Sequence, residues 1–84
     1  MNNKTLINVK LPATGKGYDF WVPDGMRMQD VSQLVCQAMQ TIEPDFFRCT
    51  GTQTLMYERT GQIQDPGATV GQIGFTDGDA FILA

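Results

Sequence analysis

Histidine is absent from this sequence of 84 residues, and long hydrophobic runs are absent as well. Without histidine there can be no Ser-His-Asp or Cys-His nucleophilic site, and most zinc sites are excluded too. No apolar run approaches the roughly 18 residues of a membrane-spanning helix, and the first residues have no apolar core of a signal peptide. We therefore expect no catalytic residue, metal, cofactor or direct membrane insertion.

Cysteine and positive charge are also scarce. Two cysteines, Cys36 and Cys49, are too few for a metal site without histidine, and we expect free, partly buried thiols in a reducing cytoplasm. Six Lys and Arg residues stand against nine Asp and Glu residues, for a net charge of −3. The three lysines all precede Gly17 and form no dense basic cluster, so we expect no nucleic-acid partner.

The first half of the chain shows two alternating segments and then a helical pattern. Apolar residues alternate over 6–11 and again over 18–22, and the Pro- and Gly-containing stretch between them predicts a hairpin. A stripe at helical spacing predicts a helix from near Arg27 to near Ile42, which ends before Pro44. The stripe consists of Met28, Val31, Val35, Ala38, Met39 and Ile42.

The second half predicts two more strands. These strands cover 54–59 and 80–84. Between the two strands we expect a short extended piece at 62–64 and then a short helical turn over 69–73, which Thr69 caps. One helix of about four turns cannot bury its apolar stripe alone, so it must lie across a sheet. We predict a single α+β domain over 1–84, with a mixed four- to five-stranded sheet and one main helix packed on one face.

This order of elements resembles the ubiquitin-like β-grasp fold. The segments that carry the resemblance are Leu55-Met-Tyr-Glu-Arg-Thr-Gly-Gln-Ile63, Thr69-Val-Gly-Gln-Ile-Gly-Phe75 and Gly78-Asp-Ala-Phe-Ile-Leu83. Within that class, the stretch from Asp65-Pro-Gly through Asp77-Gly-Asp resembles the YukD/EsaB family, the small ubiquitin-like proteins of bacterial type VII (WXG100) secretion systems. The resemblance covers residues 5–84.

The resemblance implies a non-catalytic protein-interaction module, an accessory or regulatory component of such a secretion system. It implies a cytoplasmic monomer that meets the inner face of the membrane through protein partners, which are membrane or ATPase components of the machine. The alternative is a ubiquitin-type or sulfur-carrier protein that is charged at its C-terminus. Those proteins resemble this one in fold but end in a flexible Gly-Gly tail, whereas this sequence ends Phe81-Ile-Leu-Ala84, so we expect no such charging.

The candidate binding residues follow from strand alternation. If Leu55, Tyr57, Phe81 and Leu83 point into the core, Met56 and Ile82 point out of the uncovered sheet face. In a β-grasp those two strands are neighbours, so Met56 would lie near Ile82, with Ala80 or Ala84 beside them. Trp21 also points outward, either as a secondary contact or as a side chain that lies over Lys10 and its neighbours. Exposed apolar patches often mark binding sites, but scattered surface apolar residues are common as well.

Overall fold

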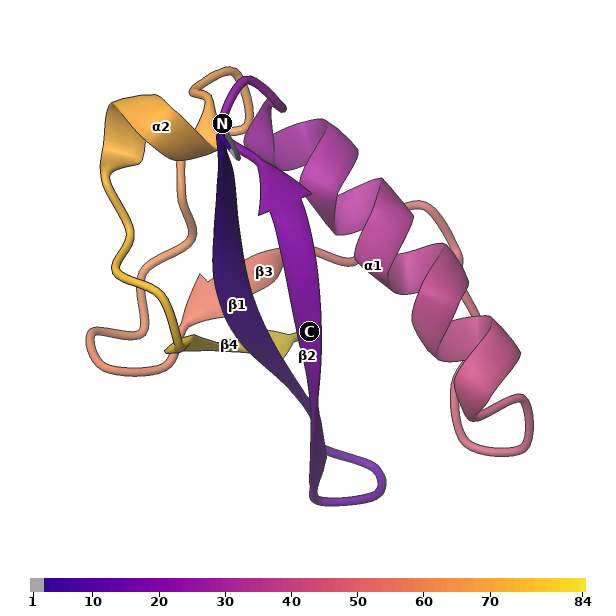
Figure 1. Ribbon diagram of the computed structural model, residues 1–84. Helices are drawn as coiled ribbons and strands as arrows, with labels where there is room; N and C mark the ends of the chain where they lie inside the picture. The colour runs from indigo at the N-terminus through magenta and orange to yellow at the C-terminus, as the bar shows by residue number, and fades with distance from the viewer. Residues whose placement is uncertain (1–2) are drawn as a thin grey trace.

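A computed structural model describes residues 3–84, in which one long helix crosses one face of a four-stranded sheet (Figure 1). The elements in chain order are β1 (Lys4–Leu11), β2 (Lys16–Pro23), α1 (Met28–Ile42), β3 (Leu55–Tyr57), α2 (Val70–Ile73) and β4 (Asp79–Leu83). The sheet order is β2-β1-β4-β3. The β1–β4 pair is parallel and the other two pairs are antiparallel, which confirms the predicted mixed sheet and α+β class.

The β1–β2 hairpin forms as predicted but is longer at both ends. Its register pairs Val9 with Tyr18 and Ile7 with Phe20, so alternate residues of both strands point toward α1. The turn closes where the N–H of Gly15 donates to the carbonyl of Leu11 at 2.9 Å, with Gly15 at a φ of +71°. That left-handed conformation is one that glycine adopts without the steric cost of a side chain.

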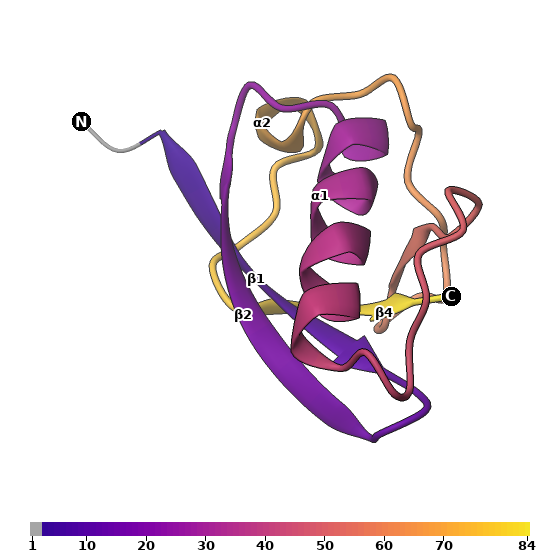
Figure 2. The ribbon, with the colours of Figure 1, turned by 90° about the vertical axis from the view of Figure 1, so that its right-hand side faces the viewer.

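Helix α1 lies across the inner face of the sheet, inside the curve of the hairpin (Figure 2). Its buried residues are Met28, Val31, Val35, Cys36 and Met39. Asp30 lies in the first turn, where a negative charge favours the helix dipole. One residue of the predicted stripe is placed differently: Ile42 is 45% exposed, because it is the last helical residue and the chain turns away after it.

The core lies between α1 and the sheet. Phe81 of β4 is fully buried at its centre, with the rings of Phe75 and Tyr57 at centroid distances of 4.8 and 5.4 Å. Leu55 and Leu83 are buried beside it, as the strand alternation predicted. The outer face of the sheet carries no second layer of helix in the described part of the chain.

Two details of the second half depend on glycine and on a cap. Strand β3 ends at Tyr57, earlier than predicted, because the N–H of Gly61 bonds to the Tyr57 carbonyl at 2.7 Å and closes a turn. The predicted extended piece is reduced to one bridge, between Met56 and Ile63. The predicted helical turn is confirmed as α2, where Thr69 and Gln72 form a reciprocal capping box.

The expectation of two free thiols is wrong in this structure. Cys36 of α1 and Cys49 of the following loop form a disulfide, with Cα atoms 5.4 Å apart. Sequence spacing gave no sign of it, because the 13-residue separation becomes a short distance only when the loop folds back along α1. No helix in the described residues is long and apolar enough to span a membrane.

Candidate functional site

The candidate site is the outer face of the sheet, which α1 does not cover. Met56 of β3 and Ile82 of β4 are directly opposite each other in the antiparallel register. Their neighbours in sequence, Tyr57 and Phe81, form the next pair and point to the core. Because successive side chains alternate between faces, Met56 and Ile82 lie side by side on the outer face, as predicted.

Ala84 continues this face past the end of β4. Its N–H donates to the carbonyl of Thr54 at 3.0 Å, and the N–H of Thr54 donates to its carbonyl at 2.9 Å. Ala84 is two residues beyond Ile82, so alternation places its methyl group on the same side. Met56, Ile82 and Ala84 therefore form one apolar patch, hereafter the outer patch.

An ion pair borders the outer patch, and sequence reasoning missed it. Lys10 Nζ lies 2.7 Å from Glu58 Oε1. Lys10 belongs to β1 and Glu58 directly follows β3, so the pair spans the intervening strand β4 on the outer face. Lys10 is aligned with Ile82 in the parallel register. The methylene stem of Lys10 can therefore cover part of the apolar surface beside Ile82, while its charge stays in water.

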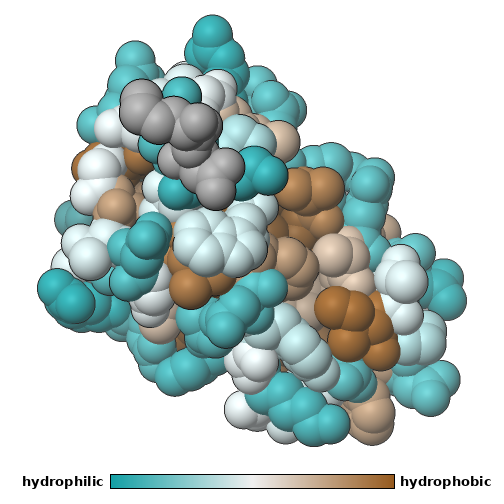
Figure 3. Space-filling view, viewed as in Figure 1, coloured by the Kyte–Doolittle hydropathy of each residue, from teal (hydrophilic) through white to brown (hydrophobic). Residues whose placement is uncertain are grey.

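Trp21 does not belong to the outer patch. It is 59% exposed, as predicted for an outward residue of an edge strand, but its partner in the register is Leu6, at the opposite end of β1 from Lys10. A polar pair separates the two places, with Asn8 Nδ2 donating to Asp19 Oδ1 at 2.9 Å. The space-filling view of the side with β1, β2 and α1 shows separate hydrophobic patches with hydrophilic residues between them (Figure 3).

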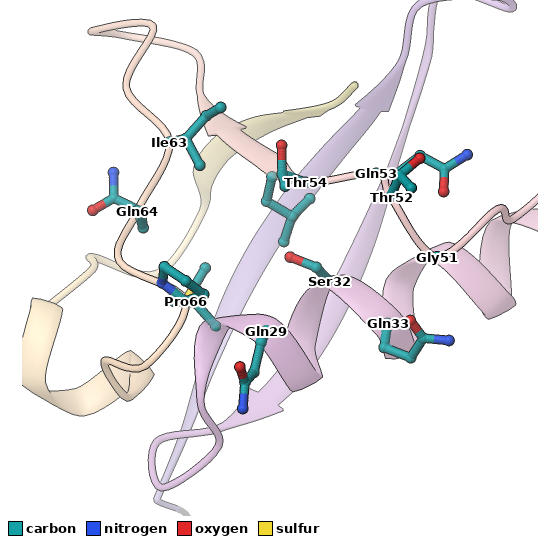
Figure 4. Close-up of a pocket in the computed structure, with 12 residues that line it drawn as sticks. Gln29, Ser32, Gln33, Gly51, Thr52, Gln53, Thr54, Ile63, Gln64 and Pro66 are labelled. Carbon is teal, nitrogen blue, oxygen red and sulfur yellow. The ribbon is translucent and has the colours of Figure 1, made fainter.

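A second feature is a groove of about 200 Å³ on the α1 side of β3. Figure 4 shows Gln29, Ser32 and Gln33 projecting from α1 on one side, with the chain from Gly51 to Thr54 along the other. None of the residues that line it is charged. The groove therefore offers amide and hydroxyl groups for hydrogen bonding and apolar surface for packing, but no side chain suited to general acid or base catalysis at neutral pH.

The described side chain with a shifted pKa, Tyr18, lies away from both the outer patch and the groove. Tyr18 donates its hydroxyl hydrogen bond to Glu43 Oε1 at 2.6 Å, which joins β2 to the residue after α1. This hydrogen bond, followed by partial burial and the negative charge of Glu43, raises the pKa of Tyr18 above its ordinary value of 10.0. The described residues contain no cluster of three or more Cys, Asp or Glu placed to hold a metal ion.

Comparison by sequence found no matching family model and no matching curated protein. Comparison of structures did find similar folds. The ubiquitin-like domain of the Mycobacterium tuberculosis type VII secretion protein ECCD1 superimposes with a TM-score of 0.76, at 13% identity over 96% of this chain and 97% of that one.

Two further ubiquitin-like structures cover nearly the whole chain. Caldiarchaeum subterraneum ubiquitin gives a TM-score of 0.69 at 26% identity, covering 95% of this chain and 90% of that one. The UBL domain of Plasmodium falciparum Dsk2 gives 0.70 at 14% identity, covering 95% of each. The chain thus has the ubiquitin-like β-grasp fold that the sequence predicted, a fold whose neighbours include a domain from a type VII secretion system.

Proposed function

We propose that this protein is a non-catalytic protein-interaction module, and that it serves a bacterial type VII (WXG100) secretion system as an accessory or regulatory component of the YukD/EsaB family. It acts as a monomer in the cytoplasm, on membrane or ATPase components of the machine. The structural likeness to the ECCD1 domain supports the secretion role, and the segments that resemble YukD/EsaB support the family.

The observation that carries the interaction role is the pairing of Met56 with Ile82 on the uncovered face. Both side chains remain partly exposed, and no layer of this chain packs over them in the described residues. Apolar residues that lie together on an open sheet add little to the core but give a partner a surface to bury. The Lys10–Glu58 ion pair at the border would favour one orientation of that partner.

The test is a double substitution in the outer patch, Met56→Arg with Ile82→Glu. The opposite charges face each other across the β3–β4 pair, so the fold is retained while the apolar surface is lost. N-terminally tagged protein is purified from its own host at native level, and co-purifying proteins are identified by mass spectrometry. We expect the parent chain to retain secretion-machine components. The double variant should recover about tenfold less of them, which corresponds to about 1.4 kcal/mol of binding free energy.

Leu34→Glu is the matched control, because Leu34 is 43% exposed on α1, on the other side of the molecule. It should retain the partners. Trp21→Ala measures the contribution of Trp21 apart from that of the outer patch. It should weaken capture of the partners less than the outer-patch variant does. A folded outer-patch variant that captures the same partners as the parent would overturn the assignment. Adducts that survive a denaturing wash would instead support a covalently attached carrier.

A further inference from the structure

The disulfide joins the middle of α1 to an irregular loop. Cys36 is 2% exposed within the helix, whereas Cys49 is half-buried in the loop that follows. Their Cα separation of 5.4 Å is within the normal range for a disulfide. The more accessible partner is therefore Cys49, whose sulfur offers the point of attack for a reductant.

The loop segment around Cys49 has few links to the rest of the fold. Its ends are anchored, since Phe47 packs against the core and Thr54 pairs with Ala84. Between them, the side chain of Gln53 bonds mainly within the segment, to the Arg48 carbonyl at 2.9 Å and from the Thr50 N–H at 2.9 Å. These internal bonds keep the segment compact without holding it against the helix.

Besides the approach of Gln53 Oε1 to within 3.3 Å of Cys36 Sγ, which carries no proton in the disulfide, two links hold this segment against α1. One is the disulfide, and the other is a hydrogen bond of 2.7 Å from the N–H of Cys49 to Gln40 Oε1. A single hydrogen bond to an exposed glutamine contributes little on its own. The disulfide is therefore the main link between α1 and residues 48–53.

The same segment forms a wall of the groove. Gly51, Thr52 and Gln53 face the first half of α1 across it, as Figure 4 shows. The opposite wall includes Ser32 and Gln33, less than two turns before Cys36 on the helix. The disulfide joins the two elements that carry these walls, so it limits how far residues 51–53 can move away from α1.

We propose that Cys36–Cys49 is a reversible thiol–disulfide exchange site that controls this wall of the groove. A thiolate of a dithiol reductant attacks Cys49 Sγ, the S–S bond breaks, and Cys36 leaves as a thiolate that takes a proton. The second thiolate of the reductant then attacks the reductant's first sulfur, which is bonded to Cys49 Sγ in the mixed disulfide. Cys49 leaves as a thiolate and takes a proton. Two electrons pass to the cysteines, and the dithiol becomes a disulfide.

The structure accommodates the reduced state. Gln53 Oε1 lies 3.3 Å from Cys36 Sγ while it also accepts from the N–H and the hydroxyl of Thr50, so the thiol formed on reduction meets a shared oxygen acceptor as long as the segment keeps its place. In a reducing cytoplasm, where we propose the protein acts, disulfides are commonly transient or redox-sensing rather than structural.

Hydrogen exchange on the intact protein tests the inference without any substitution. The oxidised protein is compared with protein reduced by excess dithiothreitol, and amide exchange is measured residue by residue by NMR. We expect exchange of residues 49–53 to rise about tenfold or more on reduction, while exchange in β1 and β4 changes less than about twofold. Reoxidation with glutathione disulfide should restore the amide exchange rates of the oxidised protein.

The Cys36→Ala, Cys49→Ala double variant is the control, and its exchange should not respond to dithiothreitol. Equal amide exchange of residues 49–53 in the oxidised and reduced parent would overturn the inference that the disulfide governs this wall of the groove. If both cysteines of the parent still react with N-ethylmaleimide after equilibration with glutathione disulfide, the exchange site itself is refuted. Neither result depends on the proposed secretion role, so the two proposals fail separately.

Discussion

Strand β4 offers a direct test of which face packs on α1, because two adjacent residues have opposite environments. Phe81 is fully buried against Phe75 and Tyr57, whereas Ile82 is partly exposed in the outer patch. The perturbation is truncation to alanine at each position in turn. The two variants share the strand and its hydrogen bonds, so they differ chiefly in what the lost side chain contacted.

The expected costs differ severalfold. Phe81→Ala removes a buried ring and leaves a cavity, which costs about 3–5 kcal/mol, including its aromatic contacts. Ile82→Ala loses partial packing and strand propensity, about 1 kcal/mol. A domain of 84 residues has a total stability of roughly 4–13 kcal/mol, so Phe81→Ala comes close to unfolding the protein. Phe81→Leu is the milder companion and should cost about 1–3 kcal/mol.

Urea unfolding followed by circular dichroism measures all three variants, with the m-value checked for two-state behaviour. The order of stability should be parent, then Ile82→Ala, then Phe81→Leu, with Phe81→Ala the least stable. A larger loss for Ile82→Ala than for Phe81→Leu would refute the reasoning. It would mean that β4 presents its other face to the helix, since a slip of one residue exchanges the two faces.

Three further predictions concern single interactions. Absorbance titration of the Tyr57→Phe variant should show Tyr18 ionising with a pKa above 10.0. Because the folded state holds the proton more tightly, stability should be lost as the pH rises from 10.0 through the folded-state pKa. Glu43→Gln should lower the pKa of Tyr18. A double-mutant cycle on Lys10 and Glu58 should give about 0.2–1 kcal/mol that declines with added salt; no salt dependence would argue against an exposed ion pair. Thr69→Ala should cost about 1 kcal/mol in urea unfolding, and an unchanged midpoint would exclude a contribution from the capping box.

Features that depend on residues near one another in the chain could be read from the sequence. The period of two in β1 and β2 and the helical spacing in α1 identified those elements and most of their buried residues. The Thr69 cap was recognisable because its partner Gln72 is three residues away. Local periodicity erred at the ends of elements, as at Ile42 and in β3, where turns and exposure decide the boundary.

The composition of the candidate site was only partly accessible in this way. The opposition of Met56 and Ile82 was predicted, but through the resemblance to a known fold, since alternation alone does not say which strands are neighbours. Trp21 was predicted as a secondary contact, and the register places it opposite Leu6, apart from the outer patch, so its part in binding stays a prediction. The Lys10–Glu58 pair, separated by 48 residues, has no signal in local sequence.

By itself, then, the sequence determined the kinds of element and the face that each residue of a strand presents, because both depend on local backbone geometry. The tertiary structure decided which faces meet. Placing β4 between β1 and β3 brought Lys10 to Glu58, and folding the loop along α1 brought Cys49 to Cys36. Such contacts depend on how the whole chain closes around one core, and short-range patterns carry no information about that closure.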